Sequence, residues 1–281
     1  MKKLHKLAAA SAFAFAASAS QAAVVENWAF SVDLNWVPSA TVFNQNATLQ
    51  RGETKVTDTV ISWGSKAKFN YKGKTTTPDY KILDADAAYA RSGLEISKSH
   101  VTGSVATNGG SIDANMFTHY NNAIAATFDD LRRTQMAVSV DLWIPGTGLY
   151  AETLTKKFDV YFKETPNNSG ACAWGACEDD IFAIISKADF SSTFTYGGVD
   201  YTFNYFDTNS SLKLLSDGTC RQVGITTGSC YGFVTKENGV TDVNFSFSVT
   251  AVPEPETYAM LLAGLGIVGF VARRRRSVVR N

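Results

Sequence analysis

Five segments of this chain alternate apolar residues with polar or small ones, and this alternation limits the possible folds more than any other feature. In such a segment every second side chain lies on the same face, as in a β-strand with one buried face. Many strands of this kind bury their apolar faces when two sheets pack together. The sequence therefore predicts an all-β, antiparallel β-sandwich and leaves open whether its topology is jelly-roll or immunoglobulin-like. The five segments are Trp28 to Trp36, Met136 to Ile144, Phe158 to Phe162, Val199 to Tyr205 and Val243 to Val249.

Weaker patterns, separated by turn residues, predict further strands. These strands are Thr54 to Trp63, Lys66 to Tyr71, Gly93 to Ser97, His100 to Ala106 and Ile181 to Ile185. Short helices are expected only at Asp84 to Ser92 and Asn121 to Arg133. Residues 23–251, about 230 in number, are long enough for one domain with an adequate core.

Residues 1–22 have the pattern of a secretory signal peptide, which is removed from the mature protein. Lys2, Lys3 and Lys6 precede an apolar stretch from Leu7 to Ala17, and Ser20 to Ala22 supplies the small residues that signal peptidase accepts. Export by the Sec translocase and cleavage after Ala22 are expected.

A second addressing segment occupies residues 252–276. Its motif of Pro253, Glu254 and Pro255 is followed by an apolar run over residues 257–272. As a transmembrane helix this run spans roughly 24 Å, which is less than the hydrocarbon core of about 30 Å, so it is a provisional anchor. The arginine cluster that follows belongs on the cytoplasmic side, as does the tail at 277–281, and the body is then expected in the periplasm or beyond it, at the cell surface or in the extracellular matrix. The cluster consists of Arg273, Arg274, Arg275 and Arg276.

The segment from Val252 to Arg276 resembles the PEP-CTERM sorting signal of Gram-negative bacteria that produce exopolysaccharide. The resemblance implies recognition by an exosortase, a membrane transpeptidase expected to cut near the Pro-Glu-Pro motif and to release or transfer the body.

The string from Thr118 to Asn122 is similar to the defining motif of the THxN family of PEP-CTERM proteins, with Thr118, His119 and Asn121 at its fixed positions. This second resemblance covers nearly the whole body and implies no particular activity. From the residues alone, His119 is expected in a loop after Gly110. It is either a ligand, with its tautomer fixed by its neighbours, or, as we favour, a group that satisfies buried backbone atoms at a sheet corner.

Four cysteines lie in the body: Cys172, Cys177, Cys220 and Cys230. In an oxidising compartment an even number of cysteines predicts disulfides. Pairing Cys172 with Cys177 and Cys220 with Cys230 is favoured, because each bond closes a short loop and is worth about 2 to 3 kcal/mol. A zinc site is disfavoured, since neither pair has a neighbouring histidine.

Carboxylates gather at Asp84 to Asp86, at Asp129 and Asp130, and at Glu178, Asp179 and Asp180. Calcium requires six to eight oxygen ligands, and the sequence contains no EF-hand loop, so solvated loops are favoured over a metal site. The run from Glu178 to Asp180 is the first calcium candidate, because it follows Cys177. No cofactor is predicted.

The charge balance excludes one class of partner. Of 26 basic and 26 acidic residues, eight basic and two acidic ones lie in the terminal segments, which leaves an acidic body. Without a basic stripe, such a body is not expected to bind nucleic acid.

The expected function is that of an exported structural or adhesive component of the envelope or biofilm matrix. No catalysis is expected, since the body has no nucleophile elbow, zinc-protease helix or phosphate loop. One alternative is a carbohydrate-binding module for the exopolysaccharide, with tryptophan and tyrosine rings as stacking faces. Another is a glycan hydrolase whose two carboxylates meet only in the fold.

Overall fold

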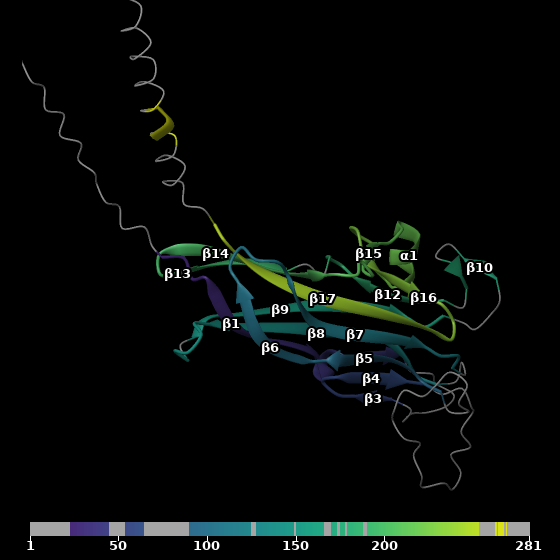
Figure 1. Ribbon diagram of the computed structural model, residues 1–281. Coiled ribbons are helices and arrows are strands. Elements are labelled where there is room, and N and C mark those ends of the chain that lie inside the picture. The colour runs from purple at the N-terminus through teal and green to yellow at the C-terminus, as the bar shows by residue number, and fades with distance from the viewer. Residues whose placement is uncertain are drawn as a thin grey trace, which may run out of the picture.

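The two antiparallel sheets of the computed structural model pack face to face, which confirms the predicted all-β sandwich (Figure 1). The structure describes residues 23–44, 54–64, 90–124, 128–148, 150–165, 170–172, 175–177, 179–187, 190–252, 262, 264–266 and 268. The predicted signal peptide and the predicted strand at Lys66 to Tyr71 lie outside these residues.

The first sheet has eight strands in the order β15-β16-β12-β9-β8-β1-β6, with β2 pairing to β8. Its strands are β1 (Asn27–Trp36), β2 (Val42–Asn44), β6 (His100–Ala106), β8 (Asp130–Trp143), β9 (Tyr150–Lys163), β12 (Asp180–Ile184), β15 (Lys213–Leu214) and β16 (Tyr231–Thr235).

The second sheet has seven strands in the order β13-β14-β17-β7-β5-β4-β3. Its strands are β3 (Lys55–Val56), β4 (Val60–Trp63), β5 (Ser92–Lys98), β7 (Ile112–Asn121), β13 (Phe190–Tyr196), β14 (Val199–Asp207) and β17 (Gly239–Ala251). Smaller elements are η1 (Pro38–Ala40), the hairpin of β10 (Ala171–Cys172) and β11 (Gly175–Ala176), and helix α1 (Asp217–Gln222).

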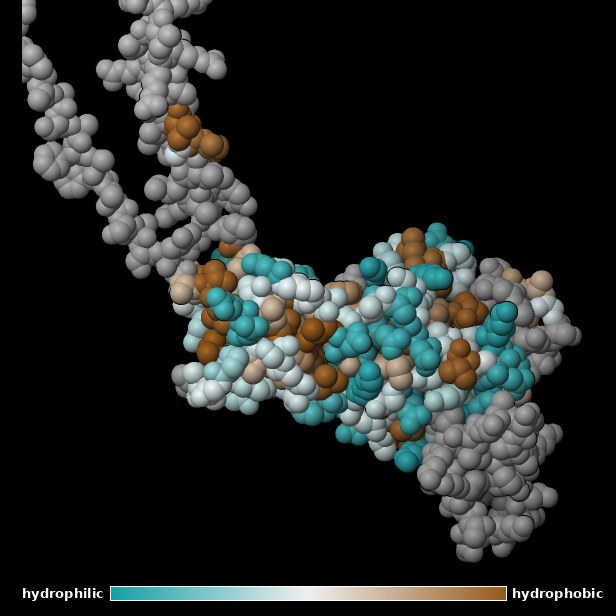
Figure 2. Space-filling view, viewed as in Figure 1, coloured by the Kyte–Doolittle hydropathy of each residue, from teal (hydrophilic) through white to brown (hydrophobic). Residues whose placement is uncertain are grey.

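The core lies between the two sheets, and the predicted alternation accounts for its composition. On β1 the side chains from Trp28 to Trp36 at every second position are at most 2% exposed. The ring of Trp28 meets Tyr201 of the opposite sheet edge to face, with 5.0 Å between ring centroids. The outer faces carry mostly polar side chains, and the view in Figure 2 shows hydrophilic and intermediate residues with small apolar groups among them. The strong strand predictions are thus confirmed as the two faces of one core.

The chain changes sheet at Ser99, the single residue between β5 and β6. The buried side chain of Asn115 supports this crossing, because its amide group donates to Lys98 O at 2.9 Å and to Ser99 O at 3.1 Å. The hydroxyl group of Tyr205 donates to the amide oxygen of Asn115 at 3.3 Å. A buried polar residue therefore satisfies the carbonyl groups that leave the sheet ladder here.

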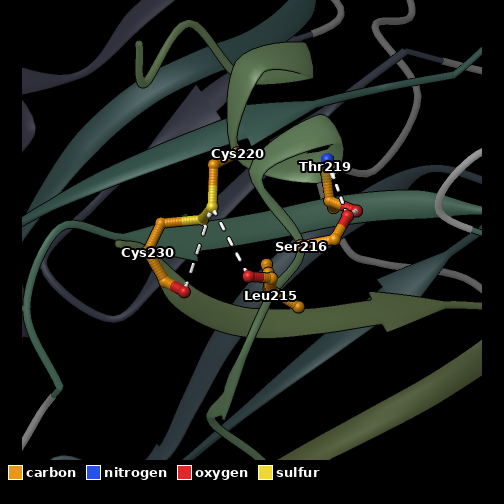
Figure 3. The surroundings of a disulfide bond; sticks show 5 residues. All are labelled: Leu215, Ser216, Thr219, Cys220 and Cys230. Atoms are coloured by element: carbon orange, nitrogen blue, oxygen red, sulfur yellow. Dashed lines mark hydrogen bonds between the residues drawn. A yellow bond between two sulfur atoms is a disulfide. The ribbon is translucent and has the colours of Figure 1, made fainter. Parts of the chain in front are cut away.

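Both predicted disulfides are present. Cys172 bonds to Cys177 and closes the β10-β11 hairpin. Cys220 of α1 bonds to Cys230 (Figure 3). The bond packs with Ile225 against Ala183 of β12. The bond therefore fixes α1 to the first sheet.

The helix predictions are wrong where the structure describes them. Asn121 is the last residue of β7 and Asp130 is the first residue of β8, so strands occupy both ends of the segment predicted as helical. Ser92 begins β5, and residues 84–89 lie outside the described residues. Helix α1 was not expected, although Ser216 is a standard N-cap whose hydroxyl accepts from Thr219 N at 3.1 Å.

Within the described part of the chain, no helix is long and apolar enough to cross a membrane. Of the apolar run at 257–272, the structure describes only residues 262, 264–266 and 268, which are helical.

Candidate functional site

The structure places His119 in β7 and not in a loop, so the loop prediction is wrong. β7 lies inside the second sheet between β17 and β5, where His119 is opposite Thr241 and Leu94. Because side chains alternate along a strand, Phe117, His119 and Asn121 face the core together.

The imidazole ring of His119 is completely buried between the sheets. Its Nδ1 lies 2.8 Å from Thr235 Oγ1, and its Nε2 lies 3.8 Å from Asp180 Oδ2. The ring is parallel to that of Trp63 within 13°, with 6.4 Å between centroids. Burial lowers the pKa of His119 from 6.5 to about 3, because the charged form loses its hydration. The folded protein therefore holds this imidazole neutral.

The other residues of the predicted family motif contact different partners. The Asn121 amide group donates to Thr235 O at 2.9 Å, inside the core. Thr118 points to the opposite face of the sheet, where its hydroxyl donates to Asp242 Oδ1 at 2.7 Å. Asn121 and Thr118 thus bond to polar groups of β16 and β17 on opposite sides of β7.

Two acidic residues at the ends of β9 and β12 contact His119 or its neighbour Trp63. Asp180 is the first residue of β12 and is fully buried, and its Oδ1 accepts from Thr165 N at 3.0 Å. Glu164 follows β9, and its Oε2 accepts from Trp63 Nε1 at 2.7 Å. The register of β12 with β9, continued one residue beyond the pair of Ile181 and Lys163, places Asp180 opposite Glu164, and each carboxyl group acts on the pKa of the other. We call Glu164, Asp180 and His119 the core acid cluster.

Burial raises the pKa of both carboxyl groups in the core acid cluster well above their ordinary values. Loss of hydration is the largest cause for each. The charge of Asp180 raises the pKa of Glu164 further, and the charge of Glu237 raises that of Asp180. Hydrogen bonds from Trp63 and from Thr165 oppose these effects but do not reverse them. The folded protein therefore favours protonated acid in this position.

At Asp180 the structure supports neither the candidate calcium site nor the solvated loop that was favoured over it. This residue lies in the core because it continues the inward face of β12, two positions before the buried Phe182. Asp179 is 8% exposed, and Glu178 lies outside the described residues. Across the ranges that the structure describes, no group of three or more His, Cys, Asp or Glu side chains has the arrangement of a metal site. Of the other carboxylate groups, Asp130 accepts from the Asn44 amide at 2.7 Å, and Asp84 to Asp86 lie outside the described ranges.

A second group of side chains lies on the outer face of the first sheet. Trp143 and Tyr150 are opposite each other at the end of the β8-β9 hairpin, with ring centroids 5.7 Å apart and planes at 55°. Tyr150 is 70% exposed. Next to them, the Thr153 hydroxyl donates to Asp141 Oδ1 at 2.7 Å. Further along this face, His100 Nδ1 lies 2.7 Å from an oxygen of Asp33. We call Trp143 and Tyr150 the aromatic pair.

The shallow hollow beside the Cys220–Cys230 bond is the third feature of the surface. It has a volume of about 270 Å³ and is lined mainly by α1 and the loop before β16, including Asp217, Arg221 and Ser229. No sequence motif pointed to it.

The residues of the predicted sorting motif, Pro253 to Pro255, and the cluster from Arg273 to Arg276 lie outside the described residues. The structure shows how the chain reaches them. β17 ends at Ala251, and Val252 N donates to Asp200 O at 2.7 Å. The sorting segment therefore begins directly at the end of the last strand of the sandwich.

Comparison with protein-family models matches residues 251–276 to the PEP-CTERM protein-sorting motif. A search of curated proteins found no match. Membership of the THxN family stays a prediction. The match falls on the segment that the sequence predicted as a sorting signal, directly after β17. The chain therefore carries a PEP-CTERM sorting motif, which marks an exported protein targeted to an exosortase.

Proposed function

We propose that this protein acts in the cell envelope or the biofilm matrix as a structural or adhesive component and does not catalyse a reaction. The observation that supports this proposal is the way the sorting motif joins the fold. β17 lies between β14 and β7 inside the second sheet, and its last residue, Ala251, is the first residue of the matched motif. The body is thus attached through an interior strand that is paired on both sides.

This attachment suits a protein that must resist pulling. In antiparallel sheets the hydrogen bonds between strands lie perpendicular to the strands. A force along β17 therefore acts in shear on its bonds to β14 over residues 245–251 and on its bonds to β7 over residues 239–247, and the strand cannot leave the sheet by breaking one bond at a time. The Cys220–Cys230 bond also holds α1 on the first sheet, so that α1 keeps its packing there.

The core acid cluster gives no support to a glycan hydrolase. The two carboxyl groups of glycosidases stand about 5 Å or more apart, on either side of the substrate. Asp180 lies opposite Glu164 at the end of the β9-β12 ladder, and the oxygens Glu164 Oε1 and Asp180 Oδ2 are buried, where a substrate does not reach them.

Replacement of Glu254 by alanine is expected to abolish both sorting and the effect of the protein on the biofilm. In cells with the exosortase, mass spectrometry of the wild-type protein should find a mature C-terminus near Pro253 to Pro255. In exosortase-deficient cells, and for Glu254→Ala, the chain should keep its residues up to Asn281.

The matched control for this experiment is Glu256→Ala, which removes an equal charge just outside the Pro-Glu-Pro motif. A strain without the protein should lose biofilm under shear, and wild type and Glu256→Ala should restore it while Glu254→Ala does not. Normal biofilm in the strain without the protein would contradict a structural or adhesive role, even if the processing is as expected.

A second candidate function, binding of the exopolysaccharide, is favoured by the aromatic pair. Aromatic rings on an exposed sheet face can stack on sugar rings, and nearby hydroxyl and carboxyl groups can bond to sugar hydroxyls. Asp141 and Thr153 lie next to Trp143 and Tyr150 along β8 and β9 and provide such groups.

Trp143→Ala is expected to raise the Kd for the purified exopolysaccharide at least about fivefold, because the contact of one aromatic ring contributes roughly 1 kcal/mol beyond its buried area. Affinity electrophoresis or calorimetry measures this change. Leu214→Ala is the control, since Leu214 is a 62% exposed apolar residue at the edge of the same sheet. Equal binding by wild type and Trp143→Ala would remove this candidate.

A further inference from the structure

We propose that Glu164 and Asp180 hold one proton between them in the core, and that this proton makes the packing of the two sheets at this end of the sandwich sensitive to pH. The inference does not depend on the proposed function.

The geometry that carries this inference is a set of buried atoms at the place where the register of β12 with β9 puts Asp180 opposite Glu164. Among the residues that the structure describes, Glu164 Oε1, Asp180 Oδ2 and His119 Nε2 are buried without a hydrogen-bond partner when both acids are ionised. The opposite oxygen of each acid already accepts a bond, from Trp63 in one case and from Thr165 in the other. Glu164 Oε1 and Asp180 Oδ2 are therefore the oxygens that need a donor.

A single proton satisfies both of these oxygens. An ionised carboxylate only accepts hydrogen bonds, whereas a protonated one also donates. With one acid protonated, its hydroxyl donates to the other carboxylate, which is among the strong charge-assisted hydrogen bonds. With both acids ionised, two like charges would lie in contact inside the core, where they are costly.

The ionisable groups around the pair favour the same state. Asp130 at the start of β8 acts on Glu164, and Glu237, between β16 and β17, acts on Asp180; both are acidic and oppose a second negative charge. His119 from β7 lies 3.8 Å from Asp180 and is held neutral by burial, so it supplies no compensating charge.

The pair also connects the two sheets. Glu164 directly follows β9 and Asp180 begins β12, both on the side of the first sheet, and their contacts reach Trp63 of β4 and His119 of β7 in the second. Loss of the proton would place two charges between the layers at this end. The sheets are then expected to separate locally, and Trp63 would lose its acceptor.

The direction of the pH dependence follows from the pKa shifts. The folded pKa of the pair is raised from ordinary values of 4.5 and 3.8, so the folded protein keeps a proton that the unfolded chain releases. This contribution to stability is complete below pH 4 and is lost as pH rises through the folded pKa.

His119 acts in the opposite direction. Its folded pKa of about 3 lies below the ordinary value of 6.5, so the unfolded chain takes up a proton that the folded protein does not. Its contribution is present above pH 6.5 and is lost as pH falls toward 3. The two effects offset each other at mildly acidic pH, and above pH 6.5 His119 no longer opposes the effect of the carboxyl pair.

Glu164→Gln tests the proposal, because a glutamine amide can donate to Asp180 permanently in place of the proton. For the wild-type body, the unfolding equilibrium constant should rise about tenfold per pH unit from pH 6.5 up to the folded pKa. In Glu164→Gln this rise should be absent. Asp159→Asn is the control, since Asp159 is an exposed acid on β9, and this variant should behave as wild type.

A second measurement does not depend on unfolding. Infrared difference spectra of the folded wild-type protein at pH 7 should show a carboxylic-acid C=O band that is absent from Glu164→Gln and present in Asp159→Asn. If Glu164→Gln does not fold, the wild-type protein alone decides whether the pair holds a proton. Its carboxylic-acid band should then disappear over the same pH range in which the fluorescence of Trp63 changes.

Two outcomes would overturn the proposal. One is the absence of a carboxylic-acid band at pH 7. The other is the loss of this band when Mn²⁺ or Zn²⁺ is added at micromolar concentration, together with a higher unfolding midpoint for wild type but not for Glu164→Gln. A cation, and not a proton, would then be the natural occupant of the pair.

Discussion

Replacing Gly232 with alanine is expected to lower the free energy of unfolding by about 3 kcal/mol, at the upper end of what overpacking costs. Gly232 lies in β16 opposite Ala183 of β12. A Cβ atom on Gly232 would lie 1.9 Å from Phe182 O and 2.9 Å from Ala183 Cα. Since these are backbone atoms of a strand that is also paired to β9, β16 has to move away and weaken its pairing. Urea unfolding of the isolated body measures the loss.

The matched control is Gly110→Ala. A Cβ atom there would meet no atom within 4 Å, and the change is expected to stay within about 0.5 kcal/mol. Similar effects of the two substitutions would show that the close approach of β16 to β12 is not needed for stability.

Phe117→Ala is expected to be the most destabilising truncation, with a loss of about 3 to 5 kcal/mol. Phe117 is fully buried, and its ring lies 5.5 Å from that of Trp36 and 5.3 Å from that of Phe182, both in the opposite sheet. It also contacts Phe245 of its own sheet, at 6.1 Å between centroids. Removal of the ring leaves a cavity among rigid aromatic side chains that cannot collapse into it.

Thermal and urea unfolding of Phe117→Ala and Phe117→Leu provide the measurement. Leucine refills part of the space, so the second variant should lose less than half as much as the first. Val240→Ala, at a position 56% exposed on the adjacent strand, should change little. A loss below about 1 kcal/mol for Phe117→Ala would contradict the assignment of Phe117 to the centre of the core.

The alternation of apolar residues predicted the core strands because each of them exposes one face to water. β7 escaped detection for the opposite reason. Its inward face carries Asn115, His119 and Asn121 beside Phe117, so the apolar period is interrupted by polar residues that are satisfied only by distant parts of the chain. Long-range partners of this kind are invisible in a local pattern.

The core acid cluster did have a signal in the sequence. Glu164 lies two positions after Phe162, and Asp180 two positions before Phe182, so both continue the inward face of a strand. His119 follows Phe117 in the same way. An acidic residue in phase with a buried face indicates a protonated or paired acid, but only the register of β9 with β12 shows that the two acids meet.

The course of β17 determines how far the core acid cluster lies from the sorting segment. Val25 and Val252, near the two ends of the body, both bond to residues of β14, so both ends of the body lie at the same pole of the sandwich. β17 runs from the neighbourhood of His119 to that pole over 13 residues, about 40 Å as a strand. The end with Glu164 and Asp180 therefore lies about 40 Å from the point where the sorting segment begins, so a change of packing there leaves the start of that segment untouched.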